Sequence, residues 1–171
     1  MEPSIWPNGH WREMQNADIS AVVRVAAVVH PLYPEKDEVF AERLHLYAAG
    51  SHVLTNEAGS IVGYIVSHPW PYGAIPMLDS SLGALPQPAD CFYIHDIALL
   101  PAIRGRRAAQ AAVAQLADHA AHSGFARMAL VAIAGTQGFW QKQGFAVIDL
   151  PSLTAKLASY DLSARYMTRA L

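Results

Sequence analysis

The stretch CFYIHDIALLPAIRGRRAAQAAVAQLADHA, residues 91–120, decides the fold class. Residues 91–100 form a mostly apolar run of strand character that ends at Pro101, as is typical of a buried central strand. Residues 105–122 then carry apolar side chains at helical spacing, which predicts an amphipathic helix. A second apolar run at 127–134 predicts another buried strand, so the three segments predict a right-handed βαβ unit.

The flanking segments alternate in the same way between helical and strand patterns, with turn signals between them. Gly50 closes the second of the predicted helices. The whole pattern predicts an α/β fold with a mixed sheet, and residues 1–171 are expected to form a single domain. We expect the further helices at 19–29, 35–48 and 136–143, and the further strands at 52–55, 61–67, 145–149 and 165–170.

The composition excludes several classes of protein. The apolar content of 53% is sufficient for a packed core, and 12 basic against 14 acidic residues give a net charge of −2. That balance predicts no binding to nucleic acid and none to an anionic membrane surface. A single cysteine, Cys91, excludes an internal disulfide and a CxxC metal site. The N-terminus lacks the pattern of a secretory signal, so we expect a cytoplasmic protein with no membrane span.

Residues 68–90 form a long, proline-rich segment that predicts an irregular loop. Long loops within a domain are often the walls or lids of a site, and the alternative is a tolerated surface insertion. Trp70, Tyr72, Asp79 and Asp90 in this loop could offer aromatic walls and carboxylates to a cationic ligand.

The segment LPAIRGRRAA, residues 100–109, lies where the first strand of the βαβ unit leads into its helix. Free backbone N–H groups and the helix dipole favour an anion at such a point. Gly105 permits close approach to the backbone, three arginines supply charge, and two small residues keep the first turn open. The segment therefore predicts a phosphate site, against the alternative of a solvated basic helix start. Its residues are Arg104, Gly105, Arg106, Arg107, Ala108 and Ala109.

Two motifs carry a resemblance to a known family. The first is RGRRAA at 104–109 and the second is FWQKQGF at 139–145. Their order and spacing after a βαβ pattern resemble the GCN5-related N-acetyltransferase (GNAT) family over residues 91–145. The resemblance implies an α/β fold of the α+β type, with a mixed, mostly antiparallel central sheet, a βαβ core and helices on both faces.

The resemblance also implies that acetyl-coenzyme A is the cofactor. Backbone N–H groups of residues 104–109 would hold its pyrophosphate, and Ile97, Ala98 and Leu99 would pair with its pantetheine arm. The N–H of Leu99 would polarise the thioester carbonyl. Trp140 and Lys142 of the second motif are also expected to contact the cofactor.

Arg107 stands where the family usually has a glycine. We expect this position to take ordinary helical angles, so that an arginine is tolerated and the site survives, with weaker affinity as one outcome.

An amine acceptor must lose a proton before it attacks a thioester, so the site needs a base. His95 is the candidate, with Tyr93 two residues earlier on the same face of the strand. The run HDIAL at 95–99 is similar to the histidine-containing strand of the arylalkylamine (serotonin-type) acetyltransferase branch, where a histidine serves as, or helps, the base. The alternative is a buried structural histidine. Asp96 faces the other way and is expected to orient backbone or to bind the acceptor's ammonium.

Many members of the family use a tyrosine as the acid where this chain has Trp140, and an indole has no proton to give near neutral pH. Either the thiolate leaves without a protein acid, or Tyr93, Tyr160 or Tyr166 serves. Cys91 is expected to be inert. His119 and His122 lie on the polar face of a helix without a third ligand, so we expect no metal.

These features predict an N-acetyltransferase that moves the acetyl group of acetyl-CoA directly to a primary amine in a ternary complex, with coenzyme A as product. The expected acceptor is a small-molecule amine bound by Trp70, Tyr72 and Asp96, and the enzyme is expected to be a monomer or a homodimer. Two alternatives stay open. One is acetylation of a protein N-terminus or lysine, and the other is a non-catalytic acyl-CoA-binding module.

Overall fold

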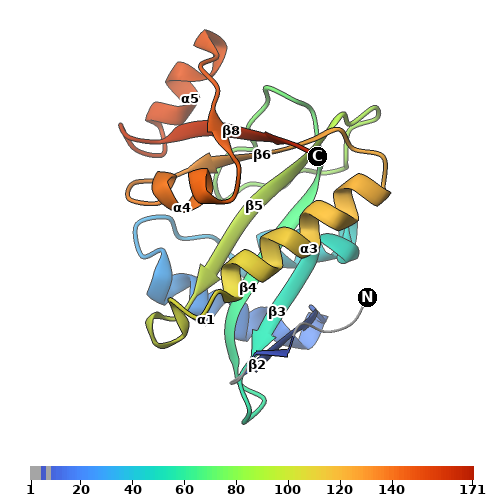
Figure 1. Cartoon of the computed structure of the whole chain (residues 1–171), viewed down its shortest axis with the longest axis vertical. Coiled ribbons are helices and arrows are strands. Elements are labelled where there is room, and N and C mark those ends of the chain that lie inside the picture. Colours follow the sequence, from blue (N-terminus) through green and yellow to red (C-terminus); the bar gives the residue numbers. More distant parts are fainter. Residues whose placement is uncertain (1–4, 7–8) are drawn as a thin grey trace.

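The computed structural model describes residues 5–6 and 9–171 of the chain. Their strands form a single mixed sheet with the order β1-β2-β3-β4-β5-β6-β8-β7 (Figure 1). The neighbours β5 (Cys91–Leu99) and β6 (Arg127–Ala132) run parallel, and the other neighbours are antiparallel. Helix α3 (Ala108–His122) joins β5 to β6, which confirms the predicted βαβ unit within a mostly antiparallel sheet.

The remaining elements flank this unit in the chain. They are β1 (Ile5–Trp6), β2 (Gly9–Glu13), α1 (Ile19–Val29), α2 (Asp37–Leu46), β3 (Ser51–Thr55), β4 (Ile61–Trp70), α4 (Gln137–Lys142), β7 (Ala146–Val147), α5 (Thr154–Ala158) and β8 (Arg165–Ala170).

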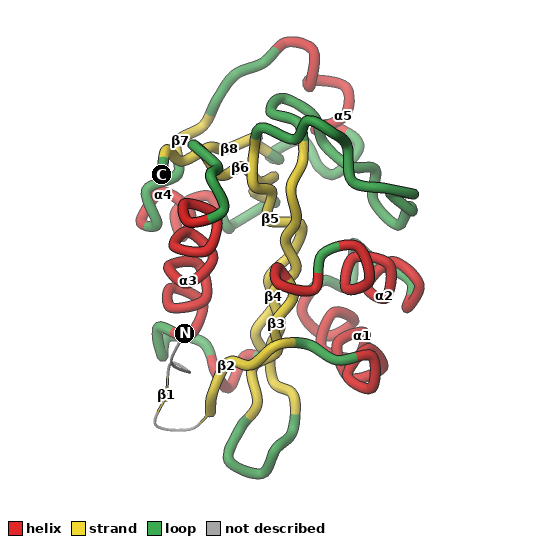
Figure 2. The backbone as a smooth tube through the Cα atoms, turned by 90° about the vertical axis from the view of Figure 1, so that its right-hand side faces the viewer, coloured by secondary structure: helices red, strands yellow, loops and turns green. Residues whose placement is uncertain are grey.

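Helices cover both faces of the sheet, with α3 on one side and α1 and α2 on the other (Figure 2). The predicted stripe of α3, which includes Val113 and Leu116, is buried against Phe92 and Ile94 of β5. On the opposite face, apolar residues of α1 and α2 pack on Tyr64 of β4. β5 is therefore covered on both faces, as its near-continuous apolar sequence predicts.

The structure corrects several predicted boundaries. The second helix spans Asp37–Leu46 rather than 35–48, which leaves Glu35 in the preceding loop. Gly50 does not close this helix. A Cβ atom there would lie 2.0 Å from the carbonyl oxygen of Ser67, so glycine is needed for close approach of the backbones. The third helix begins at Ala108 rather than 105, because residues 101–103 form a separate 3₁₀ turn.

Strand β4 continues to Trp70, so the irregular loop covers residues 71–90. The strand predicted at 127–134 ends at Ala132, and the one predicted at 145–149 is reduced to Ala146–Val147. Three elements were not predicted: β1, β2 and α5.

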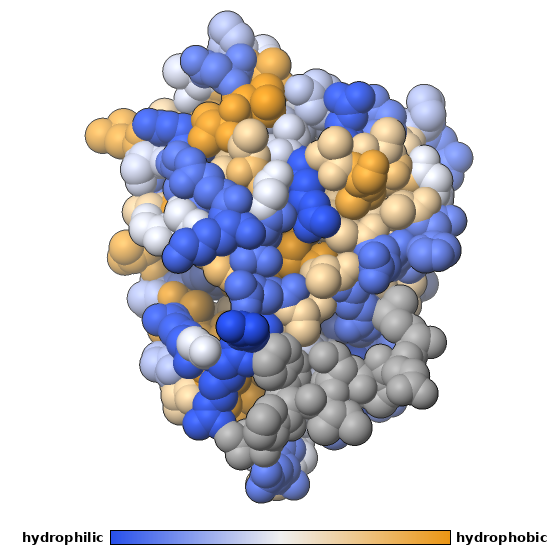
Figure 3. All heavy atoms as spheres, viewed as in Figure 1, coloured by the Kyte–Doolittle hydropathy of each residue, from blue (hydrophilic) through white to orange (hydrophobic). Residues whose placement is uncertain are grey.

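The surface is mostly polar on the face seen in Figure 1, and apolar surface is most evident at the α5 end (Figure 3). Within the described residues, no helix combines the length and the apolar character needed to cross a bilayer.

Candidate active site

Strands β5 and β6 are paired over only part of their length, and the candidate site lies where they separate. Their pairing runs from Phe92 with Met128 to Ile94 with Leu130, and both strands continue beyond it. The Leu100 N–H donates to the carbonyl of Val62 in β4. Because backbone groups alternate along an antiparallel strand, those of Ala98 also face β4, and those of Ile97 and Leu99 face the open edge.

His95 occupies a β-bulge in the same strand. Ile94 pairs with Ser67 of β4 and Asp96 pairs with Val66, so His95 is the extra residue between them. A bulge redirects a side chain and locally bends the strand. It places the His95 side chain where the two strands separate.

Below this separation lies a hollow, which we call the inner hollow. Its walls come from β5, β6 and α4, and from the loops at 30–36, 71–90 and 159–164. Most of the polar residues that line the hollow are titratable, and they lie among aromatic and aliphatic side chains. Residues that line it include His30, Tyr33, Glu35, Leu78, Tyr93, His95, Asp96, Trp140 and Tyr160.

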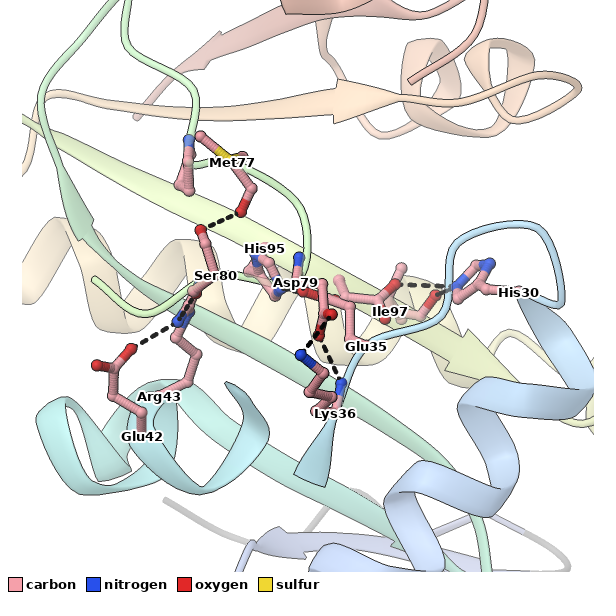
Figure 4. A network of polar contacts seen from close by, with 12 residues as sticks. His30, Glu35, Lys36, Glu42, Arg43, Met77, Asp79, Ser80, His95 and Ile97 are labelled. Atoms are coloured by element: carbon pink, nitrogen blue, oxygen red, sulfur yellow. Dashed lines mark hydrogen bonds and ion pairs between the residues drawn. The ribbon is translucent and has the colours of Figure 1, made fainter. Parts of the chain in front are cut away.

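His95 and Glu35 form a buried pair in the inner hollow (Figure 4). The Nε2 atom of His95 lies 2.9 and 3.1 Å from the two carboxylate oxygens of Glu35. Their side chains are only 4% and 6% exposed. A carboxylate in this position fixes the orientation of the imidazole, and an oriented imidazole in a cavity is the arrangement that a general base requires.

Arg43 of α2 supports the loops beside this pair. Its side chain is fully buried, and Nη1 donates to Glu42 at 2.7 Å and to the Ser80 carbonyl at 3.0 Å. Burial lowers the pKa of Arg43, and the nearby carboxylates of Glu35 and Glu42 partly offset that effect. The guanidinium therefore joins α2 to the 71–90 loop.

A second histidine–carboxylate pair lines the same hollow, so Asp96 does not face away from His95 as the sequence predicts. The Nε2 atom of His30 is 2.9 Å from Asp96 Oδ1 and 3.2 Å from the Ile97 carbonyl oxygen. Asp96 also accepts a short hydrogen bond from the Tyr64 hydroxyl. Burial alone would raise the pKa of Asp96, but the hydrogen bond and charge of His30, together with Tyr64, hold it below its usual value. Asp96 is thus committed to neighbours within the fold.

The three tyrosines considered as acids occupy different environments. Tyr93 lines the inner hollow, and burial raises its pKa well above the usual value. Tyr160 also lines the hollow, but its hydroxyl donates to the Pro76 carbonyl at 2.8 Å. Tyr166 is buried away from the hollow, where its hydroxyl accepts from the Gly73 N–H at 3.0 Å. None of them offers an easily released proton.

An open groove, which we call the outer groove, continues from the inner hollow along the free edge of β5. Ile97, Leu99, Arg104, Ala109 and Trp140, all predicted to contact the cofactor, lie along it. Trp140 is 5% exposed and packs edge-on against Phe139 and Phe145, so it serves both core and groove.

The other residues predicted for the cofactor have varied positions. Three of them lie exposed just before the start of α3: Gly105, Arg106 and Arg107. Two others are buried, Ala98 and Ala108. The carbonyl of Ala108 accepts a hydrogen bond from the Trp11 indole at 3.0 Å. Lys142 is exposed at the end of α4 and does not line the groove.

Arg107 corrects the expectation of ordinary helical angles. It is the residue before α3 and has φ 60° and ψ 12°, in the left-handed region. Gly105 nearby has φ +78°. The family's glycine therefore has a conformational role at this position, and an arginine there bears strain of about 1–3 kcal/mol. The backbone nevertheless forms the turn into α3 with an arginine at this position.

The aromatic residues predicted to bind the acceptor lie outside both cavities. The Trp70 ring packs against His68, and Tyr72 lies under the Arg127 guanidinium at 4.6 Å. Asp90 accepts from the Tyr72 N–H. The 71–90 loop reaches the inner hollow through Leu78 instead, and Asp79 beside it contacts Glu35 and Lys36.

Sequence patterns missed two functional candidates, Glu35 and His30. The pattern at 35–48 predicts that Glu35 is the first residue of a helix, and Glu35 is 60 positions from its partner His95. His30 directly follows the helix predicted at 19–29, and the sequence pattern gives it no functional role. No local spacing signals either contact, because both form through tertiary packing of the 30–36 loop against β5.

Comparison with known proteins identifies the family. The sequence matches the model of the acetyltransferase (GNAT) family over residues 12–145. The chain therefore belongs to this family, and it is a GNAT acetyltransferase that uses an acyl-coenzyme A. A comparison with curated proteins gave no match.

Solved structures share the fold at low sequence identity. Ard1 from Thermoplasma volcanium is 21% identical with a TM-score of 0.70, over 95% of this chain and 97% of that one. The loading GNATL domain of CurA from Lyngbya majuscula is 12% identical with a TM-score of 0.78, over 95% and 97%. The ribosomal-protein-S18-alanine N-acetyltransferase from Escherichia coli is 15% identical with a TM-score of 0.65, over 95% and 93%. Such likeness establishes the fold.

Proposed function

We propose that this enzyme transfers the acetyl group of acetyl-CoA to a primary amine of a small molecule, by direct attack in a ternary complex. The observation that carries the proposal is the buried His95–Glu35 pair in a hollow that opens into the outer groove. A buried base in a hollow beside a cofactor groove is the arrangement that amine acetylation needs.

The outer groove fits the cofactor. Ile97 and Leu99 present backbone groups at the free edge of β5, where a pantetheine arm could pair as an additional strand would. At its far end, the first N–H groups of α3 lack partners within the helix, and Arg104 and its neighbours add positive charge. These features would hold the pyrophosphate, and the Leu99 N–H would polarise the thioester carbonyl.

His95 would accept the proton that the acceptor's ammonium must lose, and Glu35 would stabilise the resulting imidazolium. The free amine then attacks the thioester carbon. Asp96 was also predicted to bind the ammonium, and both carboxylates are paired, Asp96 with His30 and Tyr64 and Glu35 with His95. Glu35 is the candidate for that contact because it lies beside the proposed base.

The walls of the inner hollow support a small acceptor. The Tyr160 hydroxyl donates to Pro76 at 2.8 Å and the Tyr33 hydroxyl donates to Asp161 at 2.7 Å. The Asp79 N–H donates to Glu35 at 3.3 Å. These bonds join three loops across the hollow, and an extended peptide would need an open groove between them.

Aromatic walls support a finer proposal. The inner hollow that holds Glu35 is also lined by Tyr33, Tyr93, Tyr160 and Trp140, and such a lining suits an amine with an aromatic body. The acceptor would then resemble those of the arylalkylamine branch. A cytoplasmic enzyme of one domain, acting as a monomer or homodimer, completes the proposal.

A second candidate is acetylation of protein N-termini. The E. coli structure described above is, by its name, an enzyme that acts on an alanine of a ribosomal protein. That likeness is at the level of fold, and the cross-linked loops of this chain favour the small acceptor.

A panel of acceptors with acetyl-CoA tests the proposal. Aliphatic, aromatic and polyamine compounds would be compared with short peptides that carry free N-termini or lysines, by thiol release and by mass detection of the product. We expect at least one small amine to exceed every peptide about tenfold in kcat/KM. Preference for a peptide, or acetyl-CoA binding without turnover on any acceptor, would overturn it.

A further inference from the structure

The departing thiolate needs a proton, and Trp140 stands where the resemblance leads one to expect a tyrosine acid. The thioester must lie where the inner hollow meets the outer groove, since the acceptor enters one and the cofactor lies in the other. Five described residues line both cavities: His30, Ile97, Ile133, Thr136 and Trp140. His30 is the one among these five that titrates near neutral pH.

The fold holds His30 firmly at this junction. It follows the last residue of α1, and its Nε2 atom contacts both Asp96 Oδ1 at 2.9 Å and the Ile97 carbonyl oxygen at 3.2 Å. The side chains of His30 and Asp96 are 15% and 17% exposed. Because both contacts use Nε2, Nδ1 is the ring nitrogen left for a ligand.

The charged groups around His30 favour its protonated form. Asp96 faces it from β5, and Tyr64 of β4 fixes that carboxylate. Glu35 adds a negative charge from the 30–36 loop. Burial by itself would lower the pKa of His30, but the hydrogen bond and charge of Asp96, with Ile97 and Glu35, raise it above the ordinary value.

Tyr93 lines the inner hollow but not the outer groove, and three other nearby hydroxyls are already engaged. Tyr160 and Tyr33 donate to Pro76 and Asp161. The Thr136 hydroxyl donates to the Ile133 carbonyl at 2.7 Å.

We propose that His30 is the general acid that protonates the coenzyme A sulfur as the carbon–sulfur bond breaks. This inference rests on the proposed function. The acceptor nitrogen loses two protons in total as it becomes the amide. One leaves to solvent by way of His95. The second also passes to solvent, after the carbon–nitrogen bond has formed. His30 gives its own proton to sulfur and regains one from solvent, so the products are the amide, the free thiol and one net proton.

The first test is the pH dependence of kcat. An acid must be protonated to act, so wild-type kcat should fall at high pH. His30→Gln should lower kcat by roughly 10²-fold or more and remove that basic limb. Asp96→Asn keeps the imidazole but withdraws its counter-charge, so the limb should move to lower pH. His122→Gln, an exposed histidine on α3, is the matched control and should change neither.

The second test needs no acceptor. Coenzyme A bound to the protein is titrated by the ultraviolet absorbance of its thiolate. An imidazolium beside the sulfur stabilises the thiolate, so the bound thiol should titrate at lower pH than the free thiol, and His30→Gln should abolish the difference.

The two tests separate the proposals. In one outcome the wild-type enzyme acetylates no amine, yet the bound thiol titrates at lower pH than the free thiol and His30→Gln abolishes this difference. That outcome would refute the proposed function and support the position of His30 beside the sulfur. Equal thiol titration in wild type and His30→Gln, or an unchanged basic limb in the variant, would overturn the assignment of His30.

Discussion

The outer groove, on the cofactor side, and the inner hollow, on the acceptor side, differ in how they are built. The part of the groove that is expected to bind the cofactor is one continuous segment, residues 97–109, and its predicted contacts come mainly from backbone groups. The rest of the groove is lined by residues 133–140 and by the end of α1. The inner hollow is formed by side chains from segments far apart in the sequence, such as Glu35, Leu78, His95 and Tyr160. Chemistry on the acceptor side should therefore depend on single side chains. Cofactor binding should change only gradually when side chains are replaced.

The largest effect is expected from His95→Gln. Glutamine keeps some hydrogen bonding to Glu35 but cannot accept the proton, so kcat should fall by roughly 10²–10⁴-fold. The loss should be smaller at high pH, where more of the acceptor is already neutral. KM for acetyl-CoA should stay near the wild-type value, because His95 does not line the outer groove. Steady-state kinetics across pH provide the measurement.

Glu35→Gln is the companion variant, since it keeps the shape of the carboxylate and removes its charge. We expect a smaller loss of kcat than for His95→Gln, with an additional rise in KM for the amine. Wild-type rates in both variants would make the pair a structural contact, and the base would have to lie elsewhere in the hollow.

The same difference between the two regions explains what the sequence could predict. The 91–109 segment carries its strand, its turn and its helix start in consecutive residues, so the βαβ unit and the cofactor edge follow from local pattern. The His95–Glu35 pair depends on the bulge in β5 and on how the 30–36 loop packs, and neither is encoded in local spacing. The short elements β1, β2 and α5 were missed because they carry too few residues to show a period.

A second prediction concerns stability in acid. His68 of β4 is fully buried, and its ring lies 6.3 Å from that of His95. Burial lowers its pKa from 6.5 to about 3. The neutral form is therefore native, and the unfolded chain binds one more proton as pH falls from 6.5 towards 3. Within that window, each unit by which the pH falls should lower the free energy of unfolding by about 1.4 kcal/mol because of His68.

Denaturant unfolding at several pH values checks this cost. Between pH 6.5 and 3, the slope of the unfolding free energy against pH should correspond to about one proton fewer in His68→Gln than in the wild type. This comparison of slopes does not depend on the absolute stability of the variant. The exposed His122→Gln serves as the control and should keep the wild-type slope. A wild-type slope in His68→Gln, or protonation of native His68 near pH 6 by NMR, would contradict the prediction.

On the cofactor side, Arg104→Glu combined with Arg106→Glu should raise KM for acetyl-CoA about tenfold and leave KM for the amine nearly unchanged. The remaining KM should depend less on salt, because screening acts on the attraction between the arginines and phosphate. Lys156→Glu with Arg165→Glu makes the same change in net charge at exposed positions away from the groove. If both double variants raise KM equally, the overall charge is responsible and not the 104–106 segment.

The smallest effect is expected at Arg107, and it isolates the contribution of the backbone. Arg107→Gly and Arg107→Ala both remove the charge, but glycine alone accepts φ 60° without strain. The glycine variant should therefore be more stable than the alanine variant by about 1 kcal/mol in denaturant unfolding. KM for acetyl-CoA should change little in either, and the glycine variant should bind at least as tightly because the phosphate can approach more closely. Equal stability of the two variants would mean that the turn relaxes at no cost. Loss of cofactor binding in both would show that the Arg107 side chain itself holds the phosphate, and the cofactor side would then depend on side chains as the inner hollow does.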